Sequence, residues 1–117
     1  PYYTRVLPLL DSGGILSFVD SDGRIEEIIP WYKEAGFKGC LPVEANAGND
    51  LGRIRENFPD WLMIGGIEKR ALSAGASVMR NEVRKKFELA QKGGYLPSVD
   101  QYRHYLNELK VFSRLIL

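Results

Sequence analysis

The chain alternates short apolar runs with longer segments in which apolar residues recur every three or four positions. Short runs of this kind are typical of strands buried in a parallel sheet, and the longer periodic segments are typical of amphipathic helices. The predicted strands cover residues 15–19, 39–43, 61–64 and 95–99. The predicted helices cover residues 1–10, 25–35, 51–57, 77–92 and 102–117, with a short helical turn after residue 70.

The stretch WLMIGGIEKR, residues 61–70, shows how each unit is built. Its apolar run breaks at Gly65 and Gly66 and passes into a charged cluster before helical sequence begins. In a βα unit, the loop at the carboxyl end of the strand carries the polar groups, and glycines there let a ligand approach the backbone. The same order of apolar run, polar or glycine-bearing end and helix occurs four times along the chain, which is the main indication of function.

Alternating strands and helices predict an α/β fold with a parallel sheet, for which two architectures compete. One is a small doubly wound sheet, and the other is half of a (β/α)8 barrel, whose full form needs about 250 residues. A barrel gathers all strand ends around one pocket, whereas an open sheet uses mainly its switch point. Acids or glycines follow every predicted strand: Asp20 and Asp22, Glu44 and Asp50, Gly66 and Glu68, and Asp100. The chain has no GxGxxG or Walker loop, so the pattern favours a single half-barrel domain, (β/α)4, over residues 1–117.

Composition narrows the class of protein further. The 117 residues are 44% hydrophobic and 26% charged, which is ordinary for one globular domain. A net charge of +1 without a basic run gives no reason to expect nucleic acid, and no apolar stretch approaches the roughly 20 residues that cross a membrane. The single cysteine, Cys40, lies in an apolar run and is expected to be a buried free thiol in a reducing compartment. The expected location is the cytoplasm.

The first residue is Pro1 rather than methionine, and the start shows no signal-peptide pattern, so we expect a fragment of a longer enzyme. A (β/α)4 unit has two open sheet edges and one uncovered apolar face. Exposed edges and patches of that size recruit partners, so self-association is also expected.

Three carboxylates at strand ends are the candidate catalytic residues: Asp20, Glu44 and Asp100. A carboxylate that ends a buried strand is costly unless it is paired or faces a pocket. The expected role of Glu44 is that of a general base or hydrogen-bond acceptor.

Five further residues are candidates for substrate binding: Asp22, Gly65, Gly66, Lys69 and Arg70. The two cations could meet substrate carboxylates, and Asp22 could bind a cationic group. Each has a simpler reading, since Asp22 could cap the helix 25–35, Gly65 and Gly66 could form a bare turn, and the cations could be solvated charges at a helix start.

Other polar and aromatic residues are expected to be structural. Asp50 is expected to cap the next helix, and Asn46 and Asn49 to form the loop before it. Trp31 and Trp61 are expected to pack in the core or between the barrel and its helices.

Four segments together resemble the uroporphyrinogen decarboxylase family: SDG (21–23), PVEANAGND (42–50), IGGIEKRAL (64–72) and GGYLPSVD (93–100). They occur in the family's order and spacing and correspond to the carboxyl-terminal half of its (β/α)8 barrel. The family includes the tetrapyrrole decarboxylase and the corrinoid- and coenzyme M-linked methyltransferases, and this chain is most similar to its uncharacterised bacterial branches.

The resemblance implies a lyase of porphyrin biosynthesis that decarboxylates the acetate side chains of a tetrapyrrole without a metal or organic cofactor. The family's catalytic aspartate and tyrosine lie in the other half of the barrel. Its histidine after the last strand falls near Gln101, which can donate a hydrogen bond but cannot shuttle a proton, so Gln101 joins the expected binding residues.

Two alternatives remain open at this point. One is a methyltransferase relative that passes a methyl group between a corrinoid protein and a small acceptor. Those branches hold zinc with a His-x-Cys motif after the strand equivalent to residues 15–19. This chain has Asp20-Ser21-Asp22 there, so no metal site is expected. The other alternative is a half-barrel fragment with no activity of its own, acting at most in an interaction.

Overall fold

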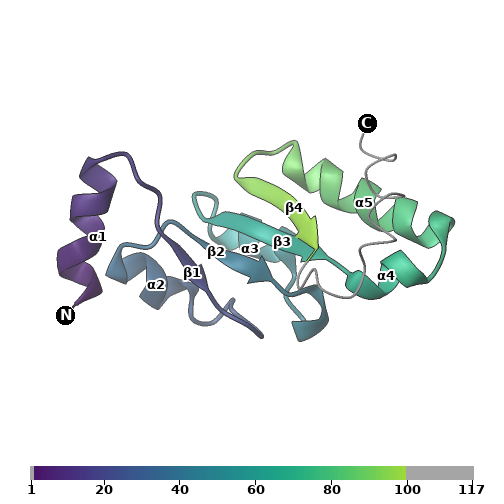
Figure 1. Ribbon diagram of the computed structural model, residues 1–117, viewed down its shortest axis with the longest axis horizontal. Helices are drawn as coiled ribbons and strands as arrows, with labels where there is room; N and C mark the ends of the chain where they lie inside the picture. Colours follow the sequence, from purple (N-terminus) through teal and green to yellow (C-terminus); the bar gives the residue numbers. More distant parts are fainter. Residues whose placement is uncertain (1, 100–117) are drawn as a thin grey trace.

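The computed structural model describes residues 2–99, and Figure 1 shows how they are arranged. The predicted helix 102–117 and the candidates Asp100 and Gln101 lie outside the described residues. The elements, in chain order, are α1 (Tyr3–Ser12), β1 (Phe18–Asp20), α2 (Ile29–Ala35), β2 (Gly39–Val43), the 3-10 helix η1 (Ala45–Ala47), α3 (Leu51–Asn57), β3 (Leu62–Ile67), α4 (Lys69–Ser73), α5 (Ala76–Ala90) and β4 (Tyr95–Val99).

The four strands form one parallel sheet in the order β1-β2-β3-β4, so the predicted α/β fold is confirmed. Connections between parallel strands are right-handed, and strands that are always added on the same side place their helices on the same face of the sheet. Figure 1 shows α3 behind β2 and β3, and α5 packs against β3 and β4. Within residues 2–99 the strand order never reverses, so the described sheet has no switch point of the doubly wound type.

The hydrophobic core lies between the sheet and its helices. Cys40, Met63 and Tyr95 lie side by side on β2, β3 and β4, and all three are buried. Helix and loop residues close over this row: Ile25, Ile29, Leu51, Ile54 and Trp61. A second cluster joins Ile67 and Val99 at the strand ends to Leu72 of α4 and Met79 of α5.

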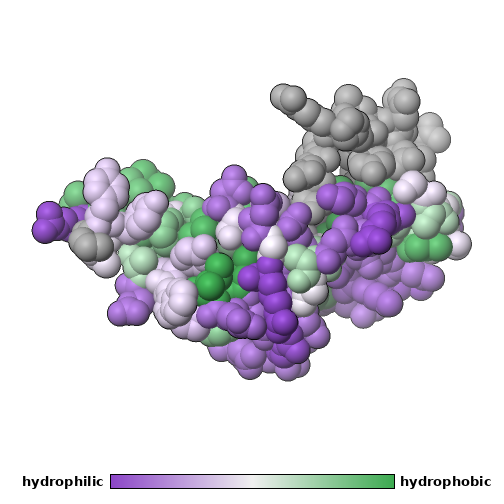
Figure 2. All heavy atoms as spheres, turned by 90° about the horizontal axis from the view of Figure 1, so that it is seen from below, coloured by the Kyte–Doolittle hydropathy of each residue, from purple (hydrophilic) through white to green (hydrophobic). Residues whose placement is uncertain are grey.

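The opposite side of the sheet is less covered, because side chains alternate between the two faces along each strand. Its apolar residues are Phe18, Leu41, Leu62, Ile64 and Leu96, and we call this surface the bare face. All five are partly or largely exposed in the described structure, Leu96 at 61%. Seen from below, hydrophobic side chains also reach the surface near the middle of the molecule, between regions of hydrophilic ones (Figure 2).

The bounds of β2, α3 and β4 agree with the prediction, whereas those of the first strand do not. Ile15 and Leu16 were expected in that strand but are more than half exposed, because β1 begins only at Phe18. Apolar residues mark a strand only where a neighbour supplies the hydrogen bonds, and pairing with β2 starts at the bond from Lys38 N to Ser17 O.

Three further expectations are corrected. The predicted helix 25–35 begins at Ile29, because residues 25–28 form a turn whose Ile25 N–H is bonded to a distant side chain. Trp61 is buried as expected, but Trp31 of α2 is 70% exposed. The third strand is longer than predicted and continues through both glycines to Ile67.

Gly66 has a structural reason to be glycine. Its φ of +79° lies in the left-handed region, and an added Cβ would come within 2.8 Å of Leu51 Cδ2 and 2.9 Å of Tyr95 Oη. The Tyr95 hydroxyl donates a hydrogen bond of 2.9 Å to Gly65 O, so side chains of α3 and β4 fill the space beside the glycine pair. The groups that approach the backbone of this glycine pair closely are therefore side chains of the protein, Leu51 and Tyr95.

We expect Gly66→Ala to lower the free energy of unfolding by about 2–4 kcal/mol, because the strain of a positive φ is added to overpacking against Leu51 and Tyr95. Gly93→Ala is the matched control, since Gly93 has φ +81° and no atom within 4 Å of an added Cβ. Urea unfolding of both variants measures the difference. Equal losses in the two would contradict the packing role.

Candidate functional site

Acidic residues lie at the carboxyl ends of three adjacent strands: Asp20 in β1, Glu44 after β2 and Glu68 after β3. Because the strands are parallel, all of these carboxyl ends lie at the same end of the sheet. Asp20 is exposed and is two residues from Phe18, so alternation places it on the bare face at the carboxyl end. The structure thus brings Asp20 and Glu44 to the same edge, as the sequence predicts.

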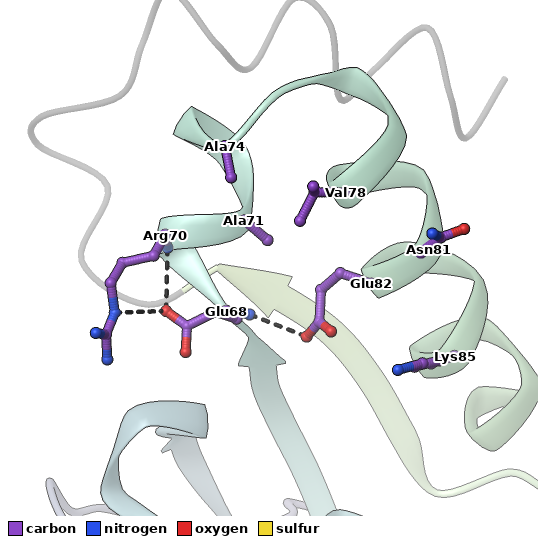
Figure 3. A pocket seen from close by; sticks show the side chains of 8 residues that line it. All are labelled: Glu68, Arg70, Ala71, Ala74, Val78, Asn81, Glu82 and Lys85. Carbon is purple, nitrogen blue, oxygen red and sulfur yellow. Dashed lines mark hydrogen bonds and ion pairs between the residues drawn. The ribbon is translucent and has the colours of Figure 1, made fainter.

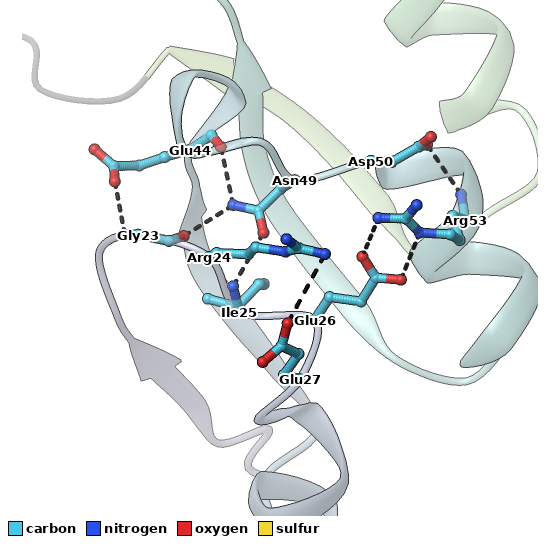
Figure 4. A network of polar contacts seen from close by, with 9 residues as sticks. All are labelled: Gly23, Arg24, Ile25, Glu26, Glu27, Glu44, Asn49, Asp50 and Arg53. Carbon is cyan, nitrogen blue, oxygen red and sulfur yellow. Dashed lines mark hydrogen bonds and ion pairs between the residues drawn. The ribbon is translucent and has the colours of Figure 1, made fainter.

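Glu44 is tied to the loop after β1, as Figure 4 shows. Its Oε2 accepts a hydrogen bond of 2.7 Å from the backbone N–H of Gly23, and Figure 4 shows its other oxygen directed away from this network. The side chain is half-buried, and the hydrogen bond from the Gly23 backbone holds its carboxylate in position. A fixed carboxylate with one oxygen turned outward can accept a proton or a hydrogen bond from a ligand.

Asn49 joins the same two loops and is the buried polar residue at the centre of Figure 4. Its Oδ1 accepts from Ile25 N at 3.0 Å, and its Nδ2 donates to Gly23 O and to Glu44 O, both at 2.9 Å. The sequence indicated only a loop former here, because two of the three partners are 24 and 26 residues away and leave no local signal. Asn49 is a positioning residue that fixes where Glu44 stands.

Arg70 connects the ends of β2 and β3. Its Nη2 donates to Asn46 Oδ1 at 2.7 Å, and its Nε lies 3.4 Å from Glu68 Oε1. Glu68 also caps α4, since Oε1 accepts from Arg70 N at 3.0 Å. The Arg70 side chain is 76% exposed, so its guanidinium is held at the strand edge while most of it still faces solvent. An arginine placed in this way can meet the carboxylate of a ligand.

A cavity of about 500 Å³ lies between α4 and α5, next to the end of β3 (Figure 3). Glu82 reaches it from α5, and its Oε1 accepts from Glu68 N at 3.2 Å and pairs with Lys86 Nζ at 3.5 Å. The walls include Ala71, Ala74 and Val78. Arg70 also lines the cavity, but Figure 3 shows its guanidinium on the other side of Glu68 from Glu82.

The structure also gives the positions of the other residues predicted from the sequence, among residues 2–99. Asp22 is exposed and does not cap the helix, because α2 begins at Ile29 with no side-chain cap, so that expectation was wrong. Asp50 does cap α3, accepting from Arg53 N at 3.1 Å. Gly65 and Gly66 lie within β3, and Lys69 is the first residue of α4. Substrate binding by Asp22, Lys69 and the glycines stays a prediction, as do the catalytic roles of Asp20 and Glu44.

Within residues 2–99 no group of three or more His, Cys, Asp and Glu side chains is placed to hold a metal ion. No helix in the same part of the chain is long and apolar enough to span a membrane. A scan against family models, a search of curated proteins and a search of solved structures each found no match to this chain.

Cys40 is buried, and its Sγ accepts a hydrogen bond of 3.2 Å from the indole N–H of Trp61. Burial raises the pKa of the thiol to about 11, because the thiolate would lose its hydration. Below that pH the folded protein keeps the neutral thiol, which is a poor nucleophile. Cys40 is therefore part of the core and does not belong to the candidate site.

At pH 8 we expect the folded chain to resist labelling by a thiol reagent and the chain in guanidinium chloride to be labelled fully. The contrast follows from the raised pKa and the burial of Cys40. Mass spectrometry after a short exposure to iodoacetamide measures it. Rapid labelling of the folded chain would mean that Cys40 is accessible.

Replacing Asn49 by alanine leaves Ile25 N–H, Gly23 O and Glu44 O without their shared partner. We expect the free energy of unfolding to fall by about 2–4 kcal/mol, since each unpaired buried polar group costs about 1–3 kcal/mol and water re-solvates some of them. Asn46→Ala is the control in the same loop, where the exposed side chain bonds only Arg70, and should cost less than about 1 kcal/mol. Equal costs in urea unfolding would contradict the central role of Asn49.

Proposed function

We propose that this chain is the carboxyl-terminal half of a (β/α)8 barrel enzyme similar to uroporphyrinogen decarboxylase, acting in the cytoplasm on the carboxylates of a tetrapyrrole. Two features support the barrel. The strands follow one another without reversal in the described sheet, and polar groups lie at the carboxyl ends of β1, β2 and β3, where barrel enzymes place their sites. The four sequence segments that resemble the family include Glu44, Asn49 and Arg70.

The observation that carries the proposal is that a positioned anion, Glu44, and a positioned cation, Arg70, both lie at the carboxyl ends of the strands. Glu44 is held by Gly23 N, and Arg70 is held between Asn46 and Glu68. A substrate that bears several carboxylates needs cationic partners to bind, and it needs anions wherever positive charge develops during the reaction. The loop after β2 and the first turn of α4 supply these two kinds of group in set positions.

The proposed reaction replaces a carboxylate by hydrogen on an acetate side chain. A proton adds to the pyrrole ring, the carbon–carbon bond to the carboxylate breaks, and its electron pair neutralises the ring as carbon dioxide leaves. A second proton then adds to the exocyclic methylene carbon and makes the methyl group, and the first proton leaves the ring carbon, which restores the aromatic ring. Asp20 and Glu44 would stabilise the protonated pyrrole electrostatically, and Arg70 would hold a carboxylate that does not react.

The other members of the proposed site are Lys69, Asp22, Gly65, Gly66, Asp100 and Gln101, with Gln101 donating a hydrogen bond to the substrate. No metal or organic cofactor is part of this proposal. Because the family's catalytic aspartate and tyrosine lie in the other half of the barrel, we expect binding but no turnover from the 117 residues alone.

Uroporphyrin is the probe for this proposal, because it carries the acetate and propionate groups of the substrate and fluoresces. We expect the chain to bind it and Arg70→Gln to raise the dissociation constant about tenfold, the effect of losing about 1.4 kcal/mol of charge-assisted contact. Arg5→Gln, an exposed residue of α1, makes the same charge change away from the strand ends and should leave binding unchanged. Fluorescence titration measures all three proteins.

Two results would contradict the proposal. One is the absence of any saturable binding by the unmodified chain. The other is an equal loss in the two arginine variants, which would show that uroporphyrin responds only to net charge.

A further inference from the structure

The bare face is a surface without a cover in the described structure. A shallow apolar cavity of about 300 Å³ lies on it, with Phe18, Leu62, Ile64 and Leu96 among its lining residues. Phe18 and Leu62 crowd over Gly39, where an added Cβ would lie 2.6 Å from Phe18 Cε1 and 2.7 Å from Leu62 Cβ. Parallel sheets occur almost only with both faces buried. We therefore expect another polypeptide surface to cover this side of the sheet.

The two outer strands show how a partner would attach. In β1, Ser17 O and Ser21 N bond to β2, so alternation directs the backbone groups of Phe18 and Asp20 to the open edge. In β4, Gly94 O accepts from Met63 N, which leaves the N–H groups of Tyr95 and Val99 at the other open edge. Within residues 2–99 no strand pairs with either edge.

We propose that, in the 117-residue chain on its own, a second copy takes the place of the barrel's other half, covers the bare face and closes an eight-stranded parallel barrel. A two-fold axis along the strands places β4 of each copy beside β1 of the other, keeps every strand parallel and makes the two junctions identical. A two-fold axis perpendicular to the sheet would pair like edges antiparallel and leave the faces uncovered, and an axis across the strands in the plane of the sheet would stack the bare faces but leave every edge unpaired. Four strands from each copy give eight, the number at which side chains fill the interior of a barrel.

Two properties of the chain favour this occupant. The bare face carries large aliphatic and aromatic residues, the kind that fill the inside of such barrels in layers. Its polar residues, Asp20 and Ser98, come at the carboxyl end, where the interior opens into the pocket. The inference rests on the barrel of the proposed function but not on its substrate. In the closed dimer, Asp20 and Glu44 from both copies surround one mouth.

Analytical ultracentrifugation of the full 117-residue chain tests the proposal. We expect a species of twice the 13.2 kDa chain mass. Leu96→Asp, on the bare face beside the β4 edge, should give the monomer, because it would bury a charge inside the barrel. Leu9→Asp is the matched control, since Leu9 is 72% exposed on α1 and should leave the dimer intact.

Hydrogen exchange provides a second measurement that does not depend on a variant. The amides of Phe18, Asp20 and Tyr95 should exchange slowly in concentrated solution and quickly on dilution, whereas the amide of Met63, bonded to Gly94 O, should stay protected in both. Fast exchange of the edge amides in concentrated solution would overturn the proposal.

The other outcomes are equally definite. A folded 13.2 kDa monomer would mean that the chain's own remaining residues or a different protein covers the face. A ladder of larger species would mean that the edges pair without closing, and dissociation by Leu9→Asp would place the interface on α1. Each of these overturns the closed dimer. If uroporphyrin binding fails while the dimer forms, only the substrate is wrong.

Discussion

The structure depends on the handedness of its strand connections. Each strand is added beside the one before it, so right-handed crossovers place every connecting helix on the same face of the sheet. One face then becomes a core of Cys40, Met63 and Tyr95 under α2, α3 and α5, and the other keeps Leu62, Ile64 and Leu96 partly or largely in solvent. The same constraint aligns the carboxyl ends of the strands. It therefore produces both the candidate site and the bare face.

Hydrogen bonds between neighbouring loops give the candidate site its form. Asn49 bonds one buried backbone group, Ile25 N–H, and two partly buried ones, Gly23 O and Glu44 O, and the Glu44 carboxylate adds a fourth bond, from Gly23 N–H. A loop that must keep these bonds cannot move without exposing unpaired groups, which is costly. Arg70 ties the next pair of strand ends through Asn46. Glu44 thus stands in a fixed position although it belongs to a loop, and Arg70 is held at the start of α4.

The sequence predicts an element correctly where the residues of that element alone determine its bounds. Strand 39–43 and helix 51–57 carry clear apolar runs and an aspartate cap, and the structure has the same bounds. The errors arise where a distant residue decides. The start of α2 depends on the bond between Ile25 and Asn49, and the start of β1 depends on Lys38 of another segment. The chain positions of the strand-end acids were readable, but their partners were not, because those pairings span 21 to 26 residues.

The glycine pair in β3 shows how one motif can combine packing with function. The sequence motif predicts that Gly65 and Gly66 contact a ligand. The space that a Cβ of Gly66 would take is, however, filled by Leu51 and Tyr95. Burial raises the pKa of Tyr95, so its hydroxyl stays protonated and continues to donate to Gly65 O. That bond anchors the strand two residues before Ile67 and three before Glu68, the cap from which Arg70 extends. The glycines can therefore support the candidate site by fixing where β3 ends, whether or not a ligand touches them.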